Sequence, residues 1–181
     1  MNLSDGKFIY RLLLFLSLFL GWTTDSVGQQ NSFPEYAMKA AFVYNFTLFT
    51  QWPEYSENTL TVCTMYSDRL REELEQFASK LTQDNKKIVI QKITRNQNAA
   101  QCQVVFLSEE DMTHAPTILA LIQNSPVLTV TDIPGWAEKG VIIGMNIQNQ
   151  RIVFEINLKS AQQAGLQLSS KLLNLARKIY K

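Results

Sequence analysis

The sequence predicts an α/β fold: a single-domain three-layer sandwich with a mixed, partly parallel sheet, an antiparallel C-terminal hairpin and a closing C-terminal helix. Short β-rich runs alternate with helical segments along most of the chain, which is typical of parallel strands joined by crossover helices. Two further β-rich runs near the end are separated by only three residues, which indicates a hairpin. The 181-residue chain is 46% hydrophobic and 18% charged, the balance of a globular protein.

The first 28 residues predict a cleaved secretory signal peptide. Two basic residues precede a nearly apolar run over 12–20, and Ser26 and Gly28 place small residues at the −3 and −1 positions of a cleavage site. An uncleaved membrane anchor is the alternative, but a membrane span needs about 20 apolar residues. We therefore expect a signal peptide over 1–28 and one mature domain over 29–181.

The first half of this domain predicts helices and strands in alternation. Residues 35–53 carry apolar side chains at helical spacing nearly all round, which predicts a well-buried helix that Pro53 ends. Strands are expected over 60–66 and 87–93. Between them, residues 68–81 place leucine and phenylalanine on one stripe, so an amphipathic helix is expected there.

The next elements continue the alternation. The apolar runs 104–107 and 127–131 predict short buried strands, with a helix over 115–123 between them. Residues 132–140 contain a Pro-Gly pair and predict a loop. Strands that alternate with helices in this way predict a partly parallel sheet.

The last elements are the hairpin and two capped helices. The hairpin strands are expected over 141–147 and 151–156. Asn157 can cap a short helix, and Ser169 can cap a last helix that runs through Ile179 with an apolar stripe on one face. This last helix is expected to close the domain.

The chain has two cysteines, Cys63 and Cys102, both in the predicted mature part. An exported chain meets an oxidising compartment, where two thiols usually pair. Cys63 lies in one predicted strand and Cys102 immediately before another, so neighbouring parallel strands would bring the two close enough to bond. Two buried free thiols are the alternative.

The residue pattern predicts neither an enzyme nor a cofactor site. His114 is the only histidine, and no Gly-x-Ser-x-Gly motif accompanies it. The acidic residues 109–111 and Asp132 follow strands, where carboxylates can hold Mg²⁺. A charged helix start and a turn residue explain them as well, and we favour that interpretation. The net charge of +1 gives no reason to expect nucleic acid as a partner.

Two residues of the 132–140 loop are candidate contacts with a partner or ligand: Asp132 and Trp136. An aromatic residue on a loop can anchor a partner. The same indole can instead fold back onto the core as a plug, and the sequence leaves both roles open.

Four stretches in order resemble the YfiR-like family of exported bacterial proteins. The first contains the series Lys-Ala-Ala-Phe-x-Tyr-Asn-Phe and closes with Trp-Pro, and the last is the most specific. The four stretches are 35–53, 104–108, 126–140 and 151–177, and the resemblance extends over nearly the whole predicted mature chain.

The resemblance implies a periplasmic regulator and not an enzyme. The best-known members bind the periplasmic sensor domain of an inner-membrane diguanylate cyclase and hold that cyclase inactive. An outer-membrane lipoprotein relieves the repression, so cyclic-di-GMP and biofilm formation respond to the cell envelope. The positions of Cys63 and Cys102 look like one of the family's disulfide pairs. A small-ligand sensor serving another membrane signalling protein is the alternative function, and a second copy of the chain is a further candidate partner.

Overall fold

The computed structural model describes residues 34–53, 59–81, 87–94 and 99–181. All of them fall within one compact unit, 33–181. The expected signal peptide and its cleavage site lie outside the described residues, so that part of the sequence analysis stays a prediction.

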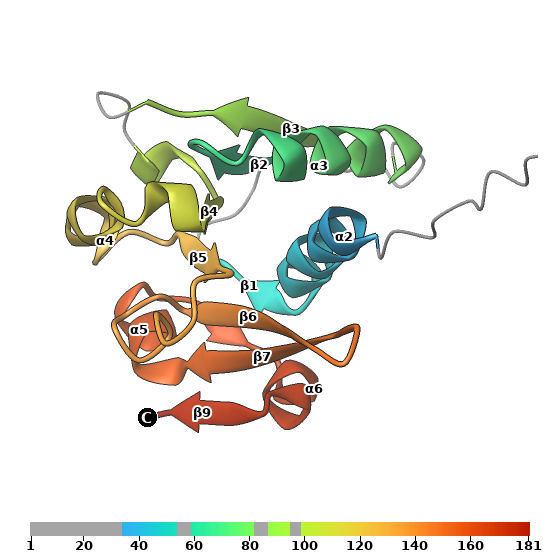
Figure 1. Cartoon of the computed structure of the whole chain (residues 1–181). Coiled ribbons are helices and arrows are strands. Elements are labelled where there is room, and N and C mark those ends of the chain that lie inside the picture. The colour runs from blue at the N-terminus through green and yellow to red at the C-terminus, as the bar shows by residue number, and fades with distance from the viewer. Residues whose placement is uncertain (1–33, 54–58, 82–86, 95–98) are drawn as a thin grey trace, which may run out of the picture. The chain divides into compact units, whose positions relative to one another are not determined.

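A seven-stranded mixed sheet forms the middle of the unit, in the order β3–β2–β4–β5–β6–β7–β9 (Figure 1). Neighbours are parallel from β3 to β6, β7 runs antiparallel to β6, and β9 is parallel to β7. The partly parallel sheet and the hairpin are thus confirmed. The strands are β2 (Thr59–Thr64), β3 (Lys87–Lys92), β4 (Val104–Leu107), β5 (Leu128–Thr131), β6 (Ile143–Gln148), β7 (Arg151–Asn157) and β9 (Lys178–Tyr180).

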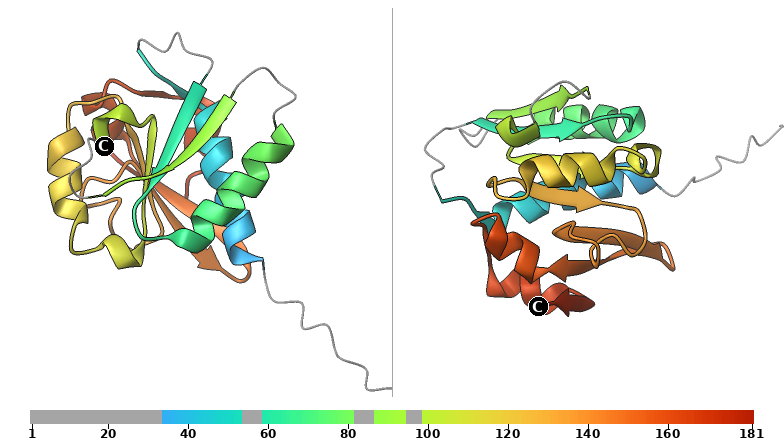
Figure 2. Two further views of the ribbon diagram at one scale, coloured as in Figure 1. Left: turned by 90° about the horizontal axis from the view of Figure 1, so that it is seen from above. Right: turned by 90° about the vertical axis from the view of Figure 1, so that its left-hand side faces the viewer.

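Helices cover both faces of this sheet and confirm the three layers. In the view from above, α2 (Glu35–Leu48) and α3 (Asp68–Leu81) lie on one side and α4 (Ala115–Ile122) lies on the other (Figure 2). Two shorter helices, α5 (Leu158–Gln163) and α6 (Ser170–Leu175), follow the hairpin.

The larger hydrophobic cluster lies between α2, α3 and the sheet. Helix α2 is apolar nearly all round, so it buries a wide stripe, as its sequence predicts. Its Phe46 meets Phe154 of β7 with ring centroids 5.1 Å apart and meets Phe42 at 5.9 Å, both edge to face. Aromatic pairs in this arrangement stabilise a core beyond the area they bury.

The smaller cluster lies on the α4 face and includes a disulfide. Cys63 of β2 and Cys102, just before β4, are bonded with their Cα atoms 6.0 Å apart, as the sequence analysis expected. Both residues are buried beside Ile118 and Ile122 of α4. The bond joins segments 39 residues apart in the sequence.

The last helix is shorter than predicted. Ser169 caps α6 as expected, because its Oγ accepts a hydrogen bond from the N–H of Leu172 at 3.2 Å. The helix ends at Leu175, and Ala176 is extended. The chain then forms β9, with Ile179 opposite Ile156, because the outer edge of β7 offers hydrogen bonds that a longer helix would leave unmade.

The hairpin also differs in detail from the prediction. Strand β6 begins at Ile143, two residues later than expected, and the connection is two residues long. Asn149 and Gln150 have φ of 48° and 60°, the left-handed conformation that a tight turn between twisted strands requires. The first helix ends at Leu48 and not at Pro53 as predicted. The chain then forms β1 (Thr50–Gln51), which pairs with β8 (Gln167–Leu168) in a small antiparallel sheet that was not predicted. Runs of two residues carry too little pattern to identify a strand.

Candidate binding cleft at the carboxyl ends of the strands

A cleft of about 510 Å³ lies where the chain leaves β4 and β5 and where α2 begins. Ligand sites of proteins commonly have volumes of about 300–1,000 Å³, and open α/β sheets bind ligands beyond the carboxyl ends of their strands. The cleft is lined by Glu35, Tyr36, Lys39, Ser67, Ser108, Glu109, Glu110, Asp132, Ile133 and Pro134.

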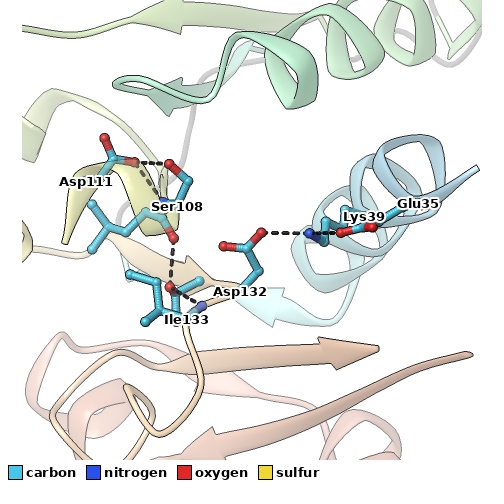
Figure 3. Close-up of polar contacts among 8 residues, drawn as sticks. Glu35, Lys39, Ser108, Asp111, Asp132 and Ile133 are labelled. Atoms are coloured by element: carbon cyan, nitrogen blue, oxygen red, sulfur yellow. Dashed lines mark hydrogen bonds and ion pairs between the residues drawn. The ribbon is translucent and has the colours of Figure 1, made fainter. Parts of the chain in front are cut away.

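A buried lysine of α2 forms one wall of this cleft. The side chain of Lys39 is only 7% exposed. Its Nζ donates to Oδ2 of Asp132 at 2.7 Å and also pairs with Glu35, one helical turn earlier (Figure 3). Burial alone would lower the pKa of Lys39, but the hydrogen bonds to Asp132 and Glu35 raise it above its ordinary value. The ammonium group therefore stays charged.

Asp132 faces Lys39 from the end of β5. One carboxylate oxygen, Oδ2, accepts the hydrogen bond from Lys39. The other, Oδ1, is buried and has no hydrogen-bond partner among the residues that the structure describes. In Figure 3 this oxygen points away from Lys39 and toward the side of Ser108. A buried acceptor without a partner is costly, and the ion pair of Oδ2 with Lys39 offsets part of that cost.

The turn beyond β4 is fixed by Asp111, which is fully buried. Its Oδ2 accepts from the backbone N–H of Ser108 at 2.7 Å and from the Ser108 hydroxyl at 2.8 Å. Its Oδ1 accepts from the backbone N–H of Tyr66, after β2, at 3.1 Å. Asp111 thus ties two strand ends together and has a structural role.

A second set of hydrogen bonds fixes the end of β5. The hydroxyl of Thr131 donates to the carbonyl of Leu107 at 2.7 Å and accepts from the N–H of Ile133 at 3.0 Å. These bonds hold the backbone on both sides of Asp132, so the carboxylate is positioned by rigid elements.

Glu109 and Glu110 are exposed at the rim of the cleft, where the sequence places a charged turn. In the part of the chain that the structure describes, no three His, Cys, Asp or Glu side chains are grouped to hold a metal ion. Asp111, the third acidic residue of this run, points to backbone groups instead.

Trp136 lies apart from the cleft. Its side chain belongs to the smaller hydrophobic cluster, the residue is 8% exposed, and the Nζ of Lys139 lies 5.4 Å from the ring centroid. The following Ala137 packs tightly on β6, since a Cβ added to Gly144 would lie 3.2 Å from the Ala137 Cβ. The sequence leaves Trp136 two roles, a partner anchor or a plug on the core, and the indole lies where a plug would lie. Asp132, by contrast, lines the cleft.

Sequence reasoning missed Lys39. The residue stands in a helix that is otherwise nearly apolar, and Glu35 precedes it by one turn. A lysine in a helix that must be buried needs a partner, because an unpaired buried charge is very costly. That pattern was the available signal, but it does not reveal that Asp132, 93 residues later, is the second partner.

The fold defines a small α/β protein with a cleft at the carboxyl ends of its strands. No helix within 34–53, 59–81, 87–94 or 99–181 is both long and apolar enough to cross a membrane. A family model described as YfiR/HmsC-like matches residues 36–177. The chain therefore belongs to the YfiR/HmsC-like family, which is known as a family of periplasmic regulators and is regulatory rather than catalytic.

Two solved structures share the fold. A conserved domain protein from Vibrio cholerae O1 biovar El Tor aligns with a TM-score of 0.56 and 10% identity over 80% of this chain. The ABC domain in complex with L-Trp from Streptococcus pneumoniae aligns with a TM-score of 0.53 and 12% identity over 79% of this chain. The chain spans 60% of the length of each, and at this identity the likeness concerns the fold alone.

Proposed function

We propose that this protein is a periplasmic regulator that represses an inner-membrane diguanylate cyclase by binding the cyclase's periplasmic sensor domain. The observation that carries the proposal is family membership over residues 36–177. The predicted signal peptide would place the domain on the periplasmic side, where it reaches the sensor domain but not the catalytic domain or its GTP. Its effect therefore passes through binding.

Repression by binding sets a condition on affinity. The regulator must bind the inactive state of the cyclase better than the active state, because equal affinity would shift no population. A preference of about 100-fold corresponds to roughly 2.7 kcal/mol. An outer-membrane lipoprotein that binds the same regulator would relieve the repression by competition.

The cleft at the strand ends is the proposed contact site. Asp132 lies there on a fixed backbone and is ion-paired with Lys39 of α2. The exposed Glu109 and Glu110 lie at its rim. Trp136 is not among the residues that line the cleft. Its indole packs in the smaller hydrophobic cluster and holds the turn that follows Asp132 against the core.

A small-ligand sensor for another membrane signalling protein is the second candidate. The volume of the cleft, about 510 Å³, favours it, because this is the range of small-molecule sites. A protein with the same fold, though only 12% identical, has been solved in complex with L-Trp. Both functions are compatible if a ligand alters the affinity for the partner.

The test is genetic. Deletion of the gene should raise cyclic-di-GMP, and the rise should vanish in a strain that also lacks the cyclase. An unchanged level after deletion would contradict the repressor role. A rise that persists without the cyclase would contradict the proposed partner, and co-purification with a different membrane signalling protein would favour the second candidate.

A further inference from the structure

We propose that a second pocket, between α4, α5 and the end of the 132–140 loop, binds a small carboxylate with a compact apolar body. This α4–α5 pocket has a volume of about 220 Å³ and shares no lining residue with the cleft at the strand ends. The inference therefore goes beyond the function proposed above and does not depend on it.

The α4–α5 pocket lies where β5 and β6 diverge. The backbone pairing of these two strands begins only at Val130 and Ile143. One residue earlier on each strand, the hydroxyl of Thr129 replaces a backbone carbonyl and accepts from the N–H of Ile142 at 2.8 Å. Thr129 and Ile142 both line the pocket, so this part of its wall is fixed by the sheet.

The buried part of the lining is mainly apolar. Ile122, Val127, Ile142 and Ala164 are each at most 7% exposed, and all four line the pocket. An apolar cavity of about 150 Å³ can hold a benzene ring. The α4–α5 pocket is somewhat larger, so it has room for one ring and a few further atoms, whose apolar surface would leave water.

The mouth of the pocket is polar. Gln123 and Gln163 are exposed, Ser160 is half-buried, and all three line the pocket. Among the described residues, none of these side chains has a hydrogen-bond partner. Each can therefore form a hydrogen bond with a ligand that places its polar group at the mouth.

Lys139 favours a negative charge on that polar group. It is the only ionisable residue among the described residues that line the pocket, and it is exposed. Its Nζ lies 5.4 Å from the ring centroid of Trp136 and forms no salt bridge within the described part of the chain. A carboxylate at the mouth can therefore accept a hydrogen bond from an ammonium that has no other anionic partner.

Other occupants fit the α4–α5 pocket less well. An organic cation would meet Lys139 and no carboxylate in the lining. A metal ion needs several ligands, and the described residues offer no group of three suitable side chains. Water alone would satisfy the polar mouth but would gain nothing from the apolar part, so the experiment has to distinguish water from a ligand.

The experiment is a titration of the mature protein, followed by the NMR shifts of its backbone amides, with probes of one shape and different charge. Benzoate is an anion, benzamide is its neutral counterpart and benzamidine is a cation. Acetate has the charge of benzoate without the ring. We expect saturable shifts with benzoate at Gly140 and Gln163, about fivefold weaker binding of benzamide, and no saturable binding of benzamidine or acetate.

Matched variants separate the charge of the pocket from its shape. Lys139→Gln should weaken binding of benzoate by about fivefold and leave benzamide unchanged. The control Lys159→Gln removes an exposed lysine outside the lining and should change neither. Ala120 is exposed and lines the pocket, so Ala120→Phe should block both probes. Its control is Leu121→Phe, at a neighbouring position that is 67% exposed and outside the lining.

All four substitutions lie at exposed positions, so melting temperatures should stay near that of the wild type. Equal affinities for benzoate and benzamidine would overturn the inference, and so would an affinity for benzoate that either Lys139→Gln or Ala120→Phe leaves unchanged. Absence of any saturable shift with benzoate at millimolar concentration would show that the pocket holds only water. Repression of the cyclase that survives loss of benzoate binding would leave the proposed function standing, since the two sites share no lining residue.

Discussion

The two faces of the central sheet are closed in different ways. One face is covered by two 14-residue helices, α2 and α3, whose apolar stripes meet a cluster rich in aromatic side chains. The other face is covered by the eight-residue α4, a disulfide, and the turn that carries Trp136. Long helices bury enough surface to hold themselves in place, whereas short segments gain stability from cross-links and single large side chains.

This difference explains where the cleft lies. Helix α2 is anchored by its core stripe along most of its length, so its first turn can carry Glu35 and Lys39 at the end of the sheet. The loop after β5 reaches the same point from the other side of the structure, and Lys39 joins the two through Asp132. The candidate site thus lies at the boundary between the two faces.

The largest expected loss of stability follows removal of an aromatic side chain from the helical face. Phe46 is 1% exposed and contacts Phe42 and Phe154. Phe46→Ala should lower the free energy of unfolding by about 3–5 kcal/mol, measured by urea denaturation. The matched control on the same helix is Leu48→Ala, since Leu48 is 54% exposed and should cost less than about 0.5 kcal/mol. Equal effects at the two positions would show that α2 is not packed as described.

The disulfide should matter nearly as much for the other face. Replacing Cys63 and Cys102 together by alanine removes a cross-link over 39 residues, worth at most about 4 kcal/mol in the chain-entropy model. Equilibrium denaturation of the double variant measures the loss. Two alkylatable thiols in native, air-exposed wild type would contradict the bond itself.

Trp136 offers the sharpest test of how the second face is closed. If the indole is a plug, Trp136→Ala should cost roughly 3 kcal/mol, and the melting temperature should fall accordingly. Binding of the partner should then weaken only as far as the fold is lost. A melting temperature near wild type together with lost binding would show that the indole acts as an anchor.

The smallest expected effect concerns the edge of the sheet. Arg177 donates a hydrogen bond to Glu155 at 2.6 Å and Tyr180 donates another at 3.0 Å. The Arg177 guanidinium lowers the pKa of Glu155, although partial burial opposes the change. The stabilisation is therefore complete above the ordinary glutamate pKa of about 4.3 and is lost as the pH falls through the lower folded value.

Glu155→Gln should reduce this acid dependence. Thermal melts between about pH 6 and about pH 3 should show a smaller fall in melting temperature for the variant than for the wild type. Identical slopes for the two proteins would show that Glu155 contributes nothing to acid sensitivity.

The sequence predicts the layers well because each depends on a local pattern. The alternation of β-rich runs and helices, the caps at Asn157 and Ser169, and the pairing of the only two cysteines all follow from neighbouring residues or simple counts. Strand β9 was not predicted because Ile179 continues the helical spacing of apolar residues. A strand is more stable than a helix there because it forms hydrogen bonds with the outer edge of β7.

The candidate site was predictable only in part. Asp132 was identified because it follows a strand, and the carboxyl ends of strands are common binding positions. Lys39 was not, because its pairing with Asp132 depends on how α2 crosses the sheet. The position of the Trp136 indole in the smaller hydrophobic cluster likewise depends on the fold, since a turn residue can point either way.

The most direct test of the regulatory role uses the membrane diguanylate cyclase of the same organism, reconstituted in vesicles with its periplasmic domain outward and GTP inside. Purified mature protein is added to the outside while cyclic-di-GMP synthesis is measured. The account predicts that synthesis falls in a saturable way with added wild-type protein. Synthesis that stays constant at saturating concentrations of folded protein would contradict it.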